Sequence, residues 1–148
     1  MSKQLYDTAY SILALGGVMS TMRMEKLVYY TNIECVKQTG EFLFPENFQA
    51  WSVGPVCPQL FDKHRGLYCI TINDFRERCP KARLLEEPYL SMARKIVADY
   101  GQFTGRELSE QFKQPGTPWT QARGNLKSYE PGTEANTITK ESLRAYYL

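Results

Sequence analysis

The stretch Trp51-Ser52-Val53-Gly54-Pro55-Val56-Cys57-Pro58-Gln59-Leu60 combines a large aromatic residue, a Gly-Pro pair and a second proline. The alternation of Trp51 with Val53 predicts a strand. Gly54-Pro55 is expected to end that strand, because glycine admits positive φ and proline fixes its own φ and has no N–H to donate. Pro58 suits the first turn of a helix, where a missing N–H costs nothing. The stretch predicts a strand, a sharp corner and a helix start, around which we expect the chain to fold.

A small β-hairpin is predicted to deliver Trp51 to this corner. Residues 42–44 form a short apolar strand, residues 45–47 have turn chemistry, and residues 48–53 return as the partner strand. A third short strand is expected within residues 68–72, where β-branched side chains occur.

Helical periodicity dominates the rest of the chain. Cap residues mark several helix ends, including a capping box formed by Thr104 and Glu107. Residues 73–87 are expected to form a loop with a short helix. The sequence thus predicts a predominantly helical α+β fold, a single domain over residues 1–148 with a small antiparallel β-hairpin packed on a helical core. Counting their caps, the expected helices cover residues 3–15, 20–40, 58–66, 88–101, 104–113, 117–123 and 139–147.

Composition limits the function classes. The chain has 148 residues, 43% hydrophobic residues and a net charge of +2, so it is long enough for a core and too neutral to favour nucleic acid or an acidic membrane. It shows neither a signal peptide nor a membrane-spanning apolar run. Widely spaced Cys35, Cys57, Cys69 and Cys79, with the single histidine His64, predict reduced thiols in a cytoplasmic protein and no metal site.

The sequence lacks the motifs of common catalytic and nucleotide-binding sites, so we expect neither an enzyme nor a cofactor. Cys57 and His64 are two helical turns apart, too far for a hydrogen-bonded dyad. His64 is therefore interpreted as a polar surface or helix-end residue. Glu25 beside Lys26 is interpreted as solvated charge.

Two stretches of the chain, taken together, are similar to a known family. They are Met24-Glu25-Lys26-Leu27-Val28-Tyr29-Tyr30 and Ala50-Trp51-Ser52-Val53-Gly54-Pro55-Val56-Cys57-Pro58, with Gly40, Leu43 and Phe44 between them. In this order they resemble the Panacea domain, the SocA-like or GepA-like family of phage and mobile-element proteins. Family members often carry a histidine shortly before the Pro-Trp pair, whereas this chain has Phe112-Lys113-Gln114-Pro115-Gly116-Thr117 there. Further matching segments are residues 100–101, 104–108, 118–123 and 138–147.

The resemblance implies an antitoxin. Members of the family neutralise unrelated protein toxins by direct binding, and at least one branch delivers its toxin to a bacterial protease as an adaptor. The alternative is a DNA- or RNA-binding regulator encoded on a prophage or mobile element, because residues 104–113 and 117–123 could form a helix-turn-helix-like pair. The near-neutral charge argues against this alternative, since phosphate contacts need clustered Lys and Arg.

A protein without catalytic groups works through shape and exposed apolar area. We expect Leu27, Tyr30 and Trp51 to lie in or near the core, with Lys26 as their exposed neighbour. The toxin-binding hypothesis rests on the rigid corner, although an equally weighted alternative is that Gly54-Pro55 only bends the chain. The hypothetical partner-binding residues are Lys26, Tyr29, Gly54, Pro55, Val56, Pro58 and Gln59, with Trp119 as the next candidate.

Overall fold

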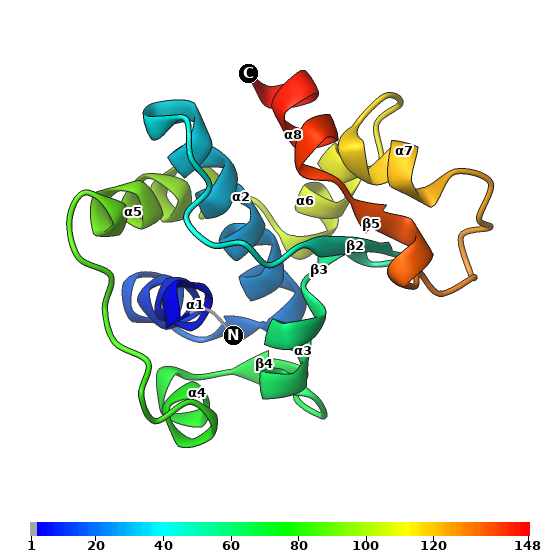
Figure 1. The fold of residues 1–148 in the computed structure, drawn as a ribbon. Coiled ribbons are helices and arrows are strands. Elements are labelled where there is room, and N and C mark those ends of the chain that lie inside the picture. Colours follow the sequence, from blue (N-terminus) through cyan, green and yellow to red (C-terminus); the bar gives the residue numbers. More distant parts are fainter. Residues whose placement is uncertain (1–2) are drawn as a thin grey trace.

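The computed structural model describes residues 3–148, and helix α2 lies at its centre (Figure 1). Fourteen of the residues of α2 (Thr21–Thr39) are buried. It packs against α1 (Lys3–Gly16) and α5 (Tyr89–Tyr100), which also contact each other. A helix buried on so many sides matches the broad apolar stripe that the sequence shows there.

Both ends of α2 are fixed by the predicted caps. The Ser20 side chain accepts a hydrogen bond from the Arg23 N–H at 3.2 Å. At the other end Gly40 adopts φ 85° and donates its N–H to the Val36 carbonyl. These caps confirm the expected boundaries of the helix.

The main sheet differs from the predicted hairpin. Strand β2 (Phe48–Trp51) pairs with β3 (Gly54–Val56) on one side and with β5 (Thr137–Ile138) on the other, all antiparallel. Trp51 pairs with Gly54, so the turn consists of Ser52 and Val53. The prediction that Gly54-Pro55 ends a strand is therefore wrong. Pro55 is accommodated because β3 is an edge strand, which tolerates a residue that cannot donate to a ladder.

The expected strand at residues 42–44 is also wrong, because this segment is irregular. The amide oxygen of Asn32 on α2 accepts hydrogen bonds from the N–H groups of Leu43, at 2.7 Å, and Phe44, at 3.3 Å. A buried side chain thus satisfies backbone groups that would otherwise need a strand partner.

The remaining elements surround this framework, and a second, two-stranded sheet joins β1 to β4. Strand β4 confirms the third strand expected within residues 68–72. The predicted short helix among residues 73–87 is α4, which begins one residue earlier and carries a capping box from Thr71. Their bounds are β1 Met19–Ser20, α3 Pro58–His64, β4 Cys69–Ile70, α4 Ile72–Arg78, α6 Gly105–Phe112, α7 Pro118–Arg123, the 3-10 helix Glu134–Asn136 and α8 Lys140–Tyr147.

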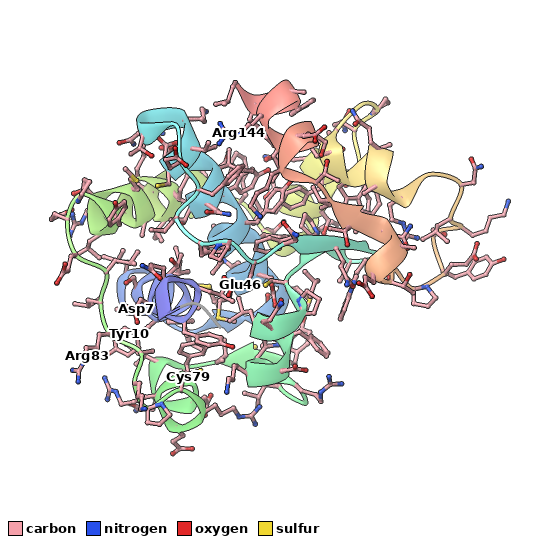
Figure 2. All side chains as sticks on the ribbon, viewed as in Figure 1. Asp7, Tyr10, Glu46, Cys79, Arg83 and Arg144 are labelled. Atoms are coloured by element: carbon pink, nitrogen blue, oxygen red, sulfur yellow. The ribbon has the colours of Figure 1, made fainter. Side chains whose placement is uncertain are left out.

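Polar side chains fasten the long connections to the helices. Asp7 on α1 accepts a hydrogen bond from the Arg83 N–H at 3.0 Å, and Ser11 accepts one from the Leu85 N–H at 2.9 Å, which holds the segment before α5 against α1 (Figure 2). Arg144 on α8 donates to the Gly40 carbonyl at 3.0 Å and so joins the last helix to the end of α2 (Figure 2).

The core contains an aromatic cluster between α2, β2 and α6. The Tyr29 ring meets the rings of Phe48 and Phe112 edge-on, with centroids 5.1 and 5.4 Å apart. Leu27 and Tyr30 lie in this core, and Trp51 is half-buried at its edge. The predominantly helical α+β fold with a small antiparallel sheet is confirmed.

Candidate functional site

A buried carboxylate fixes the corner between β3 and α3. One oxygen of Glu25 on α2 accepts the Cys57 N–H at 2.9 Å, and the other lies 2.8 Å from Nε2 of His64, the last residue of α3. Glu25 and His64 are 0% and 1% exposed. Cys57 is the N-cap of α3 and offers that helix no side-chain cap, so Glu25 holds the start and the end of α3 to α2.

These contacts correct two predictions. Glu25 is not a solvated charge, and His64, although at a helix end, is not on the surface. The sequence predicted surface positions for both residues because unpaired charges are almost never buried. In the folded protein, however, Glu25 and His64 are hydrogen-bonded to each other, so both can be buried. Burial raises the pKa of the Glu25 carboxyl, while the hydrogen bonds from His64 and Cys57 act in the opposite direction.

The Cys57 thiol has no nucleophilic character in this setting. Burial, followed by the charge of Glu25, raises the pKa of the thiol to about 12. The thiol therefore stays protonated at neutral pH, and only a thiolate is an effective nucleophile.

Lys26, the neighbour of Glu25, is also buried, with 3% of its surface exposed. The prediction that it is exposed is wrong. Its ammonium donates to the Ser109 hydroxyl on α6 at 2.9 Å, and that hydroxyl lies 3.5 Å from the Val53 carbonyl. Burial, with a smaller contribution from the charge of Lys113, lowers the pKa of Lys26 from 10.5 to about 8.

The Lys26 side chain passes close to the backbone of Gly54. The φ of Gly54 is 126°, a conformation that other residues rarely adopt. A Cβ atom at this position would lie 2.9 Å from Cε of Lys26. The backbone conformation therefore favours glycine here, and a larger residue would also force the end of the Lys26 side chain to shift.

The hypothetical partner-binding residues are mostly inside the molecule. Lys26, Gly54 and their neighbours form the underside of the corner, whereas Pro58 is half-buried and Gln59 is exposed. Trp119 is 9% exposed and donates its indole N–H to the Trp51 carbonyl at 2.8 Å. The other buried members of the set are Tyr29, Pro55 and Val56.

A pocket of about 360 Å³ opens beside the corner, between the β2–β3 turn and α6. Lys26, Arg106 and Lys113 bring three positive charges to its lining, and Ser109 lies among them. Arg106, Ser109 and Lys113 were not identified as site residues from the sequence. Their spacing of three and four positions, which places polar side chains on one helical face, is the signal that could have found them.

Residues 24–120 match the family model described as "Antitoxin SocA-like, Panacea domain". The chain belongs to this family. The predicted resemblance is thereby confirmed, and the matched span includes both Glu25 with His64 and the three cations of the pocket. No curated protein and no solved structure gives a significant match.

Within residues 3–148, no helix is both long and apolar enough to cross a membrane. The same residues contain no group of three or more His, Cys, Asp or Glu side chains arranged to hold a metal ion.

Proposed function

We propose that this protein is an antitoxin that neutralises a cognate protein toxin by direct binding. The observation that carries the proposal is the match of residues 24–120 to the SocA-like antitoxin family. The finer proposals are that the protein acts in the cytoplasm, as part of a toxin–antitoxin pair on a prophage or similar element. It needs no cofactor and no catalytic step, because masking a toxin requires only a complementary surface.

The Panacea domain extends beyond the matched residues in this proposal and covers residues 1–148. Helices α1 and α8 lie outside the match, yet both pack against α2, whose residues from Met24 onward lie within it. Because α2 buries its surface against them, the matched part alone would expose core side chains.

The binding surface that we propose is the outer side of the corner. Val53 is 42% exposed at the tip of the β2–β3 turn, and Gln59 and half-buried Pro58 follow in the first turn of α3. A β-turn that buried contacts hold rigid loses little conformational entropy when a partner binds, which favours recognition. Lys26, Tyr29, Gly54, Pro55, Val56 and Trp119 contribute from beneath, by holding the turn and strand in place.

Co-expression with the toxin encoded next to this gene tests the proposal. Wild-type protein should restore growth and co-purify with the toxin. Val53→Asp should leave the melting temperature unchanged within a few degrees but abolish both effects, because it places a charge on the apolar side chain at the tip of the turn. Val18→Asp is the matched control, since Val18 is an exposed valine on a different turn, with 66% exposure.

Failure of wild-type protein to neutralise the neighbouring toxin would overturn the antitoxin proposal. Full neutralisation by Val53→Asp would overturn only the proposed location of the binding surface, and helices α6 and α7 would become the next candidate. An adaptor mechanism is the further alternative within this function, and it predicts that toxin levels fall in growing cells and recover when the host protease is deleted.

The nucleic-acid alternative finds little support in the helices on which it rested. Arg123 on α7 is 5% exposed and donates to the Ala50 carbonyl at 3.1 Å, so it is unavailable to phosphate. On α6, Arg106 lies 3.7 Å from Glu110, and Glu107 adds a second negative charge to this helix. Neither helix thus presents the basic face that DNA or RNA binding requires.

A further inference from the structure

The ammonium of Lys26 is a buried charge without a counter-charge. It is 3% exposed, and within residues 3–148 its one hydrogen-bond partner is the neutral Ser109 hydroxyl. An ammonium has three N–H donors, so two remain available. Buried charges in proteins are normally paired, because an unpaired one costs several kcal/mol of lost solvation. A lysine left in this state at the wall of a pocket points to an anionic ligand.

The rest of the lining adds positive charge. Arg106 and Lys113 are exposed side chains that line the pocket together with Lys26, and no carboxylate lines it. Of the two acidic side chains nearest in sequence, Glu107 accepts the Thr104 N–H at 2.8 Å. Glu110 lies 3.7 Å from Arg106 in a solvent-exposed pair, which offsets part of the Arg106 charge, whereas Lys26 has no such partner among the described residues.

Two helices also begin at this pocket. Met22 is in the first turn of α2 and Arg106 in the first turn of α6, and both line it. In α2 the Ser20 side chain accepts from the third helical N–H, that of Arg23, and in α6 the Thr104 side chain accepts from the third helical N–H, that of Glu107. These caps leave the second N–H of each helix uncapped. Such amide groups and the helix dipole favour a bound anion.

We propose that the Lys26 pocket binds the phosphate group of a small ligand. A phosphate carries close to two negative charges and accepts hydrogen bonds at three oxygens, which matches three cations and free N–H donors better than a singly charged carboxylate does. The volume of about 360 Å³ lies within the range of small-molecule sites. Tyr68 lines the pocket and is 83% exposed, so its ring is available to stack on the base of a nucleotide.

Isothermal titration calorimetry on the full chain, in a buffer free of phosphate and without toxin, tests this proposal. Inorganic phosphate, pyrophosphate and adenosine diphosphate are the probes, and citrate is the comparison anion of similar charge. The phosphate probes should bind and citrate should bind at least about tenfold more weakly. If adenosine diphosphate binds more tightly than pyrophosphate and Tyr68→Ala removes the difference, the source is a nucleotide; equal affinities indicate a free phosphate or pyrophosphate.

Variants locate the site. Lys26→Met should weaken phosphate binding by about tenfold or more, the effect of losing a charge-assisted hydrogen bond. Arg106→Ala and Lys113→Ala, which alter exposed side chains and leave folding intact, should each weaken it about threefold to tenfold. Arg94→Ala is the matched control, because Arg94 is an exposed helical arginine that does not line the pocket, and it should change affinity less than twofold.

The proposal is overturned if none of the phosphate probes binds at millimolar concentration, or if citrate binds as well as they do. It is also overturned if Arg94→Ala weakens binding as much as Arg106→Ala and Lys113→Ala, because binding would then reflect net charge alone. Since no toxin is present, these outcomes are independent of the antitoxin proposal.

Discussion

Glu25 and His64 form a hydrogen bond 2.8 Å long that water does not reach, although 39 positions separate them in the sequence. The same carboxylate accepts the Cys57 N–H, so one side chain joins the central helix to both ends of α3. The corner that begins at Trp51 is thereby fixed from inside the molecule.

Glu25→Ala should lower the free energy of unfolding by about 3–5 kcal/mol, because it leaves His64 and the Cys57 N–H buried without a partner. Glu25→Gln should recover much of this loss, since its amide keeps an oxygen for the Cys57 N–H. Urea denaturation of both variants measures the difference. Equal stability of the two variants would show that the hydrogen bonds do not hold the corner.

Gly54→Ala should destabilise the protein by about 2–4 kcal/mol. The added Cβ would be strained at φ 126° and would lie 2.9 Å from Cε of Lys26. Gly54→Ala in a Lys26→Ala background, which removes the Lys26 Cε, should show whether the close contact or the backbone conformation dominates. Thermal unfolding measures both, with Gly105→Ala as the control, because a Cβ there meets no atom within 4 Å and φ is not positive.

Lys26→Met should raise the free energy of unfolding at pH 7 by up to about 3 kcal/mol, because it removes a buried unpaired charge at nearly constant volume. The Lys26 pKa is lowered from 10.5 to about 8 in the folded protein, so the unfolded chain binds more protons at this residue between those values. Its penalty is complete below pH 8 and is relieved as pH rises toward 10.5.

The advantage of Lys26→Met over wild type should consequently shrink between pH 8 and 10. Urea melts of both proteins at pH 7, 8, 9 and 10 measure it, and comparing the pair cancels the titration of tyrosines and cysteines that they share. An advantage independent of pH, or a wild type more stable at pH 7, would mean that the ammonium is adequately solvated where it lies.

Trp119→Phe should cost about 1–2 kcal/mol, since it removes the indole N–H that donates to the Trp51 carbonyl at 2.8 Å. Trp51→Phe is the comparison, and it should cost less, because the Trp51 N–H donates to the side chain of Gln49 at the half-buried edge of the sheet. Chemical denaturation monitored by circular dichroism gives both values. A larger loss from Trp51→Phe would contradict this order.

Helix caps were the most predictable part of this fold. Ser20 with Gly40, and Thr104 with Glu107, act within a few residues of the groups they satisfy, so local sequence contains the whole interaction. The hairpin was harder to predict. Residues 42–44 have the composition of a strand, but Asn32, ten or more positions away, satisfies their backbone instead.

The candidate site shows the same division. The sequence indicated that residues 24–30 and the corner at 51–60 belong together, and it indicated the family. It misjudged Glu25, His64 and Lys26, because whether a charged side chain lies in water or in the core depends on what packs over it. The pocket residues Arg106, Ser109 and Lys113 were overlooked for the same reason.

By itself, then, the sequence determined the helical framework, its caps and the family, since these follow from local spacing and from ordered motifs. Only the tertiary structure decided which charges are buried, which strand pairs with β2 and where a basic pocket opens. Those features depend on contacts between residues far apart in the chain, such as Lys26 with Ser109, and no local pattern specifies them.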